Sequence, residues 1–136
     1  MPELVAPALQ AAGNIYPSRF IVANTGSGNN REAIQATGES YYVLGVSDEG
    51  QKTQPNDGDS AGVHAADGDA IRYYQYGRDP LVELGGTVDS MTFVMPDANG
   101  KAITATSGAV ACGILLEGGV ASEKRPVLVI PSTLAP

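Results

Sequence analysis

The sequence predicts an all-β protein, and three observations lead to this fold class. From position 19 onward, about nine short runs of β-branched, aromatic or other apolar residues are separated by turn residues. The 17 Gly and 9 Pro residues are spread between those runs rather than gathered in one low-complexity block. After Gly13 no window keeps a helical apolar period beyond two turns. Together they predict a compact, β-barrel-like single domain.

The predicted strands follow one another at short spacing, at residues 19–24, 32–36, 41–46, 61–65, 70–76, 81–84, 91–95, 109–116 and 125–130. Stretches such as TGSGNN, SDEG, PDANG and EGG lie between them, and their Gly, Asn and Asp residues suit turns. Ahead of the strands, PALQAAG predicts one short helix, with Pro7 near its start and Gly13 at its end.

Three parts are expected along the chain. Residues 1–17 are apolar and rich in Ala and Pro, without alternation, and predict an extended N-terminal arm. Residues 18–131 form the barrel-like domain, and residues 132–136 a C-terminal tail.

Two segments of the expected domain resemble each other. Residues 34–50 and 103–119 share an Ile, an Ala-Thr pair, a small-residue turn and an apolar-Gly-apolar run followed by an acidic-Gly turn. We interpret them as two similar hairpins in one barrel, since two copies are too few for a solenoid. Gly45 and Gly113 lie inside their strand patterns, which indicates a bulge or a close backbone approach.

Composition excludes several kinds of partner. Eight basic against 15 acidic residues give a net charge of −7, so nucleic acid is not an expected partner. No apolar run approaches the roughly 18 residues of a membrane span, and the N-terminus lacks the pattern of an export signal. The one cysteine, Cys112, lies in an apolar run and predicts a buried thiol.

The acidic stretch NDGDSAGVHAADGDA raises the question of a metal site. Its four aspartates, Asp57, Asp59, Asp67 and Asp69, carry oxygen ligands that calcium prefers. They lack the spacing of known calcium loops, and each Asp-Gly-Asp triplet leads into a strand pattern. Solvated turns are therefore the favoured interpretation, with no metal and no cofactor.

No catalytic constellation is visible. His64 is the single histidine, which by counting excludes a multi-histidine metal site, and it has no recognisable triad partners. TGSGNN lacks the Gly-Lys-Ser/Thr ending of a phosphate-binding loop. The sequence predicts a protein that is not an enzyme.

An aromatic strand at 70–76 is the best candidate for a contact surface. Alternation places Arg72, Tyr74 and Tyr76 on one face of it. These residue types are enriched at protein interfaces, so a subunit contact competes here with ordinary half-burial.

A series of motifs runs in one order along residues 15–131: IYPSRFIVAN, EAIQAT, VLGVSDEG, DGDAIRYYQYG, FVMPDANGKAITATSGAVACGILLEGG and the closing RPVLVIP. In this order of motifs the chain resembles the capsid cement, or head decoration, proteins of tailed bacteriophages. It implies a homotrimer on the capsid exterior, made in the host cytoplasm, at three-fold and quasi-three-fold positions. There it would bridge major capsid protein subunits and stabilise the head, without catalytic residues and without membrane contact.

Within that interpretation, the arm is the expected capsid contact, through Leu4, Val5, Pro7, Leu9, Ile15 and Tyr16. Burying about 500 Å² of apolar surface gives about 12 kcal/mol, which the ordering of some fifteen residues roughly cancels. Three arms on one trimer would overcome this balance. We expect deletion of residues 1–16 to leave a folded trimer that no longer decorates capsids.

Two other function classes stay open at this point. One is a phage fibre or surface recognition module that uses the Asp-Gly-Asp loops and calcium. The other is a small trimeric β enzyme of the nucleotide-hydrolase kind, for which no phosphate-binding or metal-binding motif is visible.

Overall fold

The structure is a computed structural model that describes residues 9–25, 31–50 and 62–136. Within these ranges every regular element is a strand: β1 (Gln10–Ala11), β2 (Phe20–Ala23), β3 (Glu32–Gln35), β4 (Val43–Ser47), β5 (Tyr73–Tyr74), β6 (Leu81–Glu83), β7 (Thr92–Pro96), β8 (Ala102–Thr104), β9 (Val110–Leu115) and β10 (Lys124–Leu134). The predicted all-β fold class is confirmed. No helix in this part of the chain has the length and hydropathy of a membrane span.

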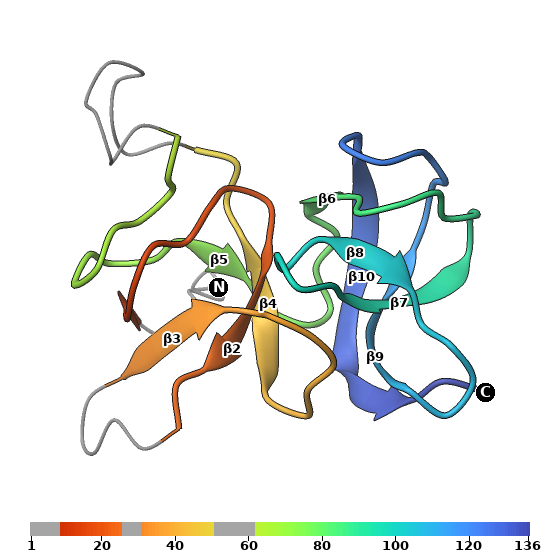
Figure 1. The fold of residues 1–136 in the computed structure, drawn as a ribbon, viewed down its shortest axis with the longest axis horizontal. Helices are drawn as coiled ribbons and strands as arrows, with labels where there is room; N and C mark the ends of the chain where they lie inside the picture. The colour runs from red at the N-terminus through yellow and green to blue at the C-terminus, as the bar shows by residue number, and fades with distance from the viewer. Residues whose placement is uncertain (1–8, 26–30, 51–61) are drawn as a thin grey trace, which may run out of the picture.

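The strands form two five-stranded sheets, which lie side by side in Figure 1. The first has the order β1-β3-β2-β4-β5 and the second β6-β10-β9-β7-β8. Each sheet curls until its edges approach. Gln10 pairs with Ala70 just before β5, and Leu84 just after β6 pairs with Ala102 in β8. We call the two nearly closed sheets the first and the second barrel.

The two barrels repeat one topology. In the first barrel β2 lies between β3 and β4, and β4 continues to β5. In the second barrel β7 lies between β8 and β9, and β9 continues to β10. All of these pairs are antiparallel. The similar segments 34–50 and 103–119 therefore belong to different sheets, and the interpretation as two hairpins is wrong because a third strand separates the two strands of each segment.

The register of the repeat is also the same at several successive pairs, up to a register shift between Ile21 and Val22 that only the first barrel has. Phe20 pairs with Val46 as Phe93 pairs with Ile114. The next pairs in line also correspond, Ile21 with Gly45 and Val94 with Gly113, followed by Val22 with Ile34 and Met95 with Ile103. Equivalent strands of the two barrels thus place equivalent side chains on equivalent faces.

Gly45 and Gly113 lie at equivalent positions of the two barrels, and each allows the neighbouring strand to approach closely. A Cβ on Gly45 would overlap the carbonyl oxygen of Tyr74 in β5, and a Cβ on Gly113 would lie 2.7 Å from Cγ2 of Val127 in β10. The sequence expectation of a close backbone approach is confirmed at Gly45.

The core consists of two buried clusters. One contains the interior of the first barrel, with Ile15, Ile21 and Ile71. The other joins the barrels, because Phe20 and Val46 on the outside of the first barrel pack in one cluster with residues of the second, such as Leu115. The two barrels therefore form one compact domain.

Residues 9–17 are part of the domain rather than a free arm. Ile15 is 0% exposed and exchanges backbone hydrogen bonds with Ala65, and the β1 strand pairs parallel with β3. The expected boundary after residue 17 therefore differs from the structure, in which the domain includes residues from Leu9 onward. A deletion of residues 1–16 would remove core atoms, so that expectation is withdrawn.

The helix expected over residues 7–13 is wrong where the structure describes it. Gln10 and Ala11 are extended, with their backbone N–H groups donating to the carbonyls of Arg31 and Asp69 at 2.8 Å each. So short a helix is only marginally stable by itself. The backbone N–H and C=O groups of this segment pair with neighbouring strands instead. Residues 7 and 8 lie outside the described part.

The C-terminal residues are likewise paired rather than a tail. β10 runs to Leu134, and Ala135 is buried. The Ala135 N–H donates to Ala109 at 2.8 Å, and the Gly108 N–H donates to Ala135 at 2.9 Å. The expected boundary at residue 132 therefore falls inside β10.

Candidate functional site

The second Asp-Gly-Asp triplet is a turn whose carboxylates bind the backbone. Asp67 Oδ1 accepts the Gly13 N–H at 2.9 Å, and Asp69 Oδ2 accepts the Ala66 N–H at 2.9 Å. Gly68 between them has φ 87°, a conformation that glycine adopts at little cost. Among the described residues no three His, Cys, Asp or Glu side chains gather as metal ligands. The first triplet, with Asp57 and Asp59, lies outside the described residues.

His64 has a structural position. Its ring is buried, with Nδ1 2.8 Å from the Gly50 carbonyl and Nε2 accepting the Arg72 N–H at 3.0 Å. These contacts assign the proton to Nδ1 and occupy both nitrogens. His64 therefore joins the beginning of the connection between β4 and β5, at Gly50, to its end, at Arg72, and backbone groups take up both of its ring nitrogens.

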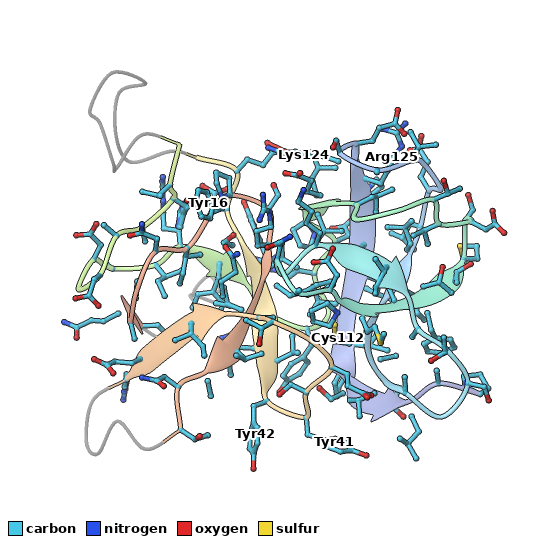
Figure 2. The ribbon with its side chains drawn as sticks, viewed as in Figure 1. Tyr16, Tyr41, Tyr42, Cys112, Lys124 and Arg125 are labelled. Carbon is cyan, nitrogen blue, oxygen red and sulfur yellow. The ribbon has the colours of Figure 1, made fainter. Side chains whose placement is uncertain are left out.

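Cys112 is buried and lies between the two barrels in Figure 2, with its thiol 3.8 Å from the Val94 carbonyl. Burial raises the pKa of this thiol far above its ordinary value of 9.0. The expected buried cysteine is confirmed, and the thiolate that reactivity requires is strongly disfavoured in the folded protein.

Alkaline pH should therefore destabilise the fold through Cys112. Below pH 9 the thiol is neutral in the folded and unfolded states, but above it only the unfolded chain loses the proton. We expect this residue alone to lower the free energy of unfolding by about 1.4 kcal/mol between pH 8 and pH 10. Urea unfolding of the wild type and Cys112→Ala at both pH values measures the effect. Equal losses in both proteins would contradict it.

A polar junction links the barrels next to the core. Glu83 lies 3.1 Å from Lys101 Nζ and 3.5 Å from Arg19 Nη2, with all three side chains mostly shielded from solvent. Arg19 Nη1 also donates to the Asn99 carbonyl at 2.9 Å. Since every acidic oxygen here faces a cation of the chain itself, this cluster fixes the barrels rather than presenting a site.

Three hollows of the surface surround β5. Two hollows of about 340 and 320 Å³ share Asp48, Tyr74 and Arg78 as walls, and a third of about 200 Å³ adjoins the second at Tyr73, Gln75 and Tyr76. We call these joined hollows the tyrosine groove, defined by Asp48, Tyr73, Tyr74, Gln75, Tyr76 and Arg78. Its walls come from β4, β5 and the connection that follows β5 towards β6.

Hydrogen bonds hold the walls of the groove in place. The Tyr74 hydroxyl donates to Asp48 Oδ1 at 3.3 Å, and Arg72 Nη2 lies 3.6 Å from Asp48 Oδ2. The nearby Asp48 carboxylate, followed by burial, raises the pKa of the Tyr74 phenol above 10.0. The phenol therefore stays protonated and donates its hydrogen bond throughout the neutral pH range.

The structure brings the predicted contact residues Arg72, Tyr74 and Tyr76 together around this groove. Tyr76 is 65% exposed and Tyr74 is 38% exposed. Sequence reasoning missed Asp48, Gln75 and Arg78, although the SDEG turn and the polar residues of YYQYGRDP were the signals that pointed to them.

The predicted capsid-binding arm is only partly within the described residues. Leu4, Val5 and Pro7 lie outside them. Leu9 packs against the core of the first barrel, and Ile15 is inside it. Tyr16 stays partly exposed, with the Arg19 guanidinium 5.5 Å from its ring centre. Ile15 is therefore not available to contact another protein.

No protein-family model matches the chain, and no curated protein matches it. A solved structure does match, described as the crystal structure of head fiber gp8.5 N base in bacteriophage phi29. The TM-score is 0.56 at 14% identity, and the match covers 93% of this chain and 94% of that chain. The fold resembles a phage head fiber base. Because the identity is low, the likeness concerns the fold, and it extends over both barrels.

Proposed function

We propose that this protein is a structural component of a phage virion. It would bind the outside of the assembled capsid as a homotrimer, at three-fold and quasi-three-fold positions, and stabilise the head by bridging major capsid protein subunits. The observation that carries the proposal is the fold match to a phage head fiber base over nearly the whole of both chains. The sequence resemblance to capsid cement proteins supports the same class independently.

The second barrel offers the subunit contact of this trimer. Phe93, Met95, Ile103, Ile114 and Leu128 lie on one outward face of it, as their strand pairings require, and all five are half-buried. We call this set the Phe93 face. In the first barrel the equivalent face, with Phe20 and Val46, is covered by the second barrel. The Phe93 face has the same pattern of apolar residues but is left uncovered within one chain. A second copy of the chain would therefore be a suitable partner for it.

We propose this contact in preference to the subunit contact expected at Arg72, Tyr74 and Tyr76. Those three side chains surround a hollow with charged walls, whereas the core of a subunit interface is depleted of charge. The Phe93 face has no charged member and meets that requirement better.

Capsid attachment is proposed for residues 1–8, through Leu4, Val5 and Pro7. One short apolar segment binds weakly because ordering it offsets the apolar area that it buries. Three segments on one trimer raise the effective concentration at a lattice of matching symmetry.

Binding to preassembled empty heads tests the proposal. We expect the purified protein to co-sediment with heads to saturation, and a variant lacking residues 1–8 to bind at least about tenfold more weakly with an unchanged melting temperature. A wild-type protein that does not co-sediment with heads would rule out the proposed function, and a truncated protein that binds like wild type would rule out the attachment segment.

The trimer contact needs a separate measurement. Phe93→Asp places a charge on the Phe93 face, and we expect it to abolish the trimer, whether the trimer forms in solution or on heads. Analytical ultracentrifugation of the protein alone and with heads measures the result. Val120→Asp is the matched control, since Val120 is an exposed apolar residue outside that face. Trimers of undiminished stability in the Phe93 variant would move the contact elsewhere.

A calcium-dependent recognition module is not favoured by the described residues. The carboxylates of Asp67 and Asp69 already accept backbone N–H groups in their own turn. The recognition alternative retains one supporting feature, the tyrosine groove, which requires no metal.

A further inference from the structure

We propose that the tyrosine groove binds a neutral polysaccharide chain. The groove takes no part in the proposed capsid contact or in the Phe93 face, so this inference does not depend on the proposed function. It rests on the shape of the groove, on the types of side chain that form its walls and on their charge.

The groove consists of three hollows that adjoin through shared wall residues. The hollows of about 340 and 320 Å³ share Asp48, Tyr74 and Arg78, and the hollow of about 200 Å³ shares its Tyr73, Gln75 and Tyr76 walls with the second. Two of the three hollows reach the lower end of the size range of small-molecule sites. Adjoining hollows of this kind accommodate successive units of a chain better than one isolated small ligand.

The walls combine ring faces with planar polar groups. Tyr74 and Tyr76 expose aromatic surface, while Gln75, Arg78 and Asp48 supply hydrogen-bond donors and acceptors beside it. A sugar ring has the complementary chemistry, because it presents a face of C–H groups and an edge of hydroxyl groups that both donate and accept. Apolar peptides or lipids would remove water from the charged side chains of the walls without offering hydrogen bonds in its place.

The charge of the groove selects against anionic polymers. The walls of the hollows contain two basic residues, Arg72 and Arg78, and three acidic residues, Asp48, Glu49 and Asp79. One of the arginines, Arg72, is engaged by Asp48 at 3.6 Å. A phosphate-containing or uronic-acid polymer would meet net negative charge here, in a chain of net charge −7. A neutral glycan meets no such repulsion.

The groove is already formed in the chain. The Arg78 N–H donates to the Gln75 carbonyl at 3.2 Å and closes a turn. Gly77 and Arg78 also exchange backbone hydrogen bonds with Val129 in β10, at 2.7 and 2.9 Å. These contacts fix the backbone from Gln75 to Arg78 before a ligand arrives, so little backbone conformational entropy is lost on binding.

Direct binding of defined oligosaccharides tests this site. The probes are the neutral hexamers of glucose, galactose, mannose and N-acetylglucosamine, with polyglycerol phosphate as the anionic comparison. Each is titrated to millimolar concentration by calorimetry and by tyrosine fluorescence, which is informative because the chain has no Trp and six Tyr residues. We expect at least one neutral hexamer to bind, and polyglycerol phosphate not to bind.

Two variants locate the binding. Tyr76→Ala is expected to weaken it by about tenfold or more, and Tyr76→Phe to retain it because the ring is kept. The matched control is Tyr41→Ala, since Tyr41 is 63% exposed against 65% for Tyr76 and points away from the domain in Figure 2. Melting temperatures of the variants check that they are folded. We expect both variants to fold because Tyr41 and Tyr76 are exposed to solvent.

Three results would overturn the proposal. They are binding of no neutral hexamer, binding of polyglycerol phosphate alone, and an equal loss of affinity in Tyr41→Ala and Tyr76→Ala. None of them bears on co-sedimentation with heads, so failure of the glycan site and failure of the capsid proposal are distinguishable.

Discussion

Replacing Phe20 by Ala is expected to lower the free energy of unfolding by about 3–5 kcal/mol, one of the largest single losses in the chain. Phe20 is 0% exposed and lies in the cluster that joins the two barrels. Removing its ring leaves a cavity between elements that are held by their own hydrogen bonds and cannot close over it.

The internal repeat supplies a matched control for this experiment. Phe93 occupies the same register in the second barrel, but its side chain is only half-buried. Phe93→Ala is expected to cost about 1–2 kcal/mol in the monomer. Urea unfolding at low protein concentration, where association does not contribute, compares the two. A loss at Phe93 equal to that at Phe20 would mean that the two faces are covered alike within one chain.

Replacing Gly45 by Ala is the second change with a large expected effect. The new Cβ would overlap the carbonyl oxygen of Tyr74 and lie 2.8 Å from its carbonyl carbon. These are backbone atoms, so the overlap is relieved only when β5 moves away from β4. We expect a loss of about 3 kcal/mol, together with faster hydrogen exchange at Tyr73 and Tyr74.

Two other glycines calibrate the Gly45 result. Gly113→Ala meets the Cγ2 methyl of Val127 at 2.7 Å and the carbonyl oxygen of Leu128 at 3.2 Å, which is less severe than the overlap at Gly45, so we expect a smaller loss of about 1–2 kcal/mol. Gly86 has no atom within 4 Å of a new Cβ, and Gly86→Ala should leave stability nearly unchanged. If Gly45→Ala were as mild as Gly86→Ala, the close approach of β5 would not constrain the fold.

The sequence predicted most strands because their apolar runs are bounded by turn residues. The strands that fall on predicted runs are β2, β3, β4, β5, β6, β7, β9 and β10. β8 was missed because Ala102–Thr104 is three residues long and flanked by Lys and Ala, without a clear apolar pattern. The run at 61–65 was predicted as a strand, but within its described residues only Ala65 forms a bridge, to Ile15.

The arrangement of the strands was not predictable in the same way. The order β3-β2-β4 follows from pairings between distant residues, which local patterns do not encode. The segment at 9–13 carries helix-favouring residues, yet the partners that make it a strand, Arg31 and Asp69, are far away in sequence. The repeat was visible as two similar sequence segments, but only the strand pairing in the structure showed that each segment belongs to a separate barrel.

The candidate site was predictable only in part, because a local run of residues is visible in the sequence but the contacts between distant residues are not. Arg72, Tyr74 and Tyr76 stand out in one aromatic run, and the structure brings them together. The groove exists because β4 brings Asp48 next to β5 and because Val129 of β10 holds the turn at Gly77 and Arg78. The two hydrogen bonds of His64 likewise join residues whose proximity is not predicted by any local sequence pattern.

The position of β10 has a consequence for biosynthesis. The strand Lys124–Leu134 is the last of the ten in chain order, yet it is an inner strand of its sheet, between β6 and β9. All strands of the first barrel precede Leu81. During translation the first barrel therefore has its full set of strands early, while the second lacks an inner strand until Leu134 has left the ribosome. Until then Phe20 and its neighbours on the outside of the first barrel lack the complete second barrel that buries them in the finished chain.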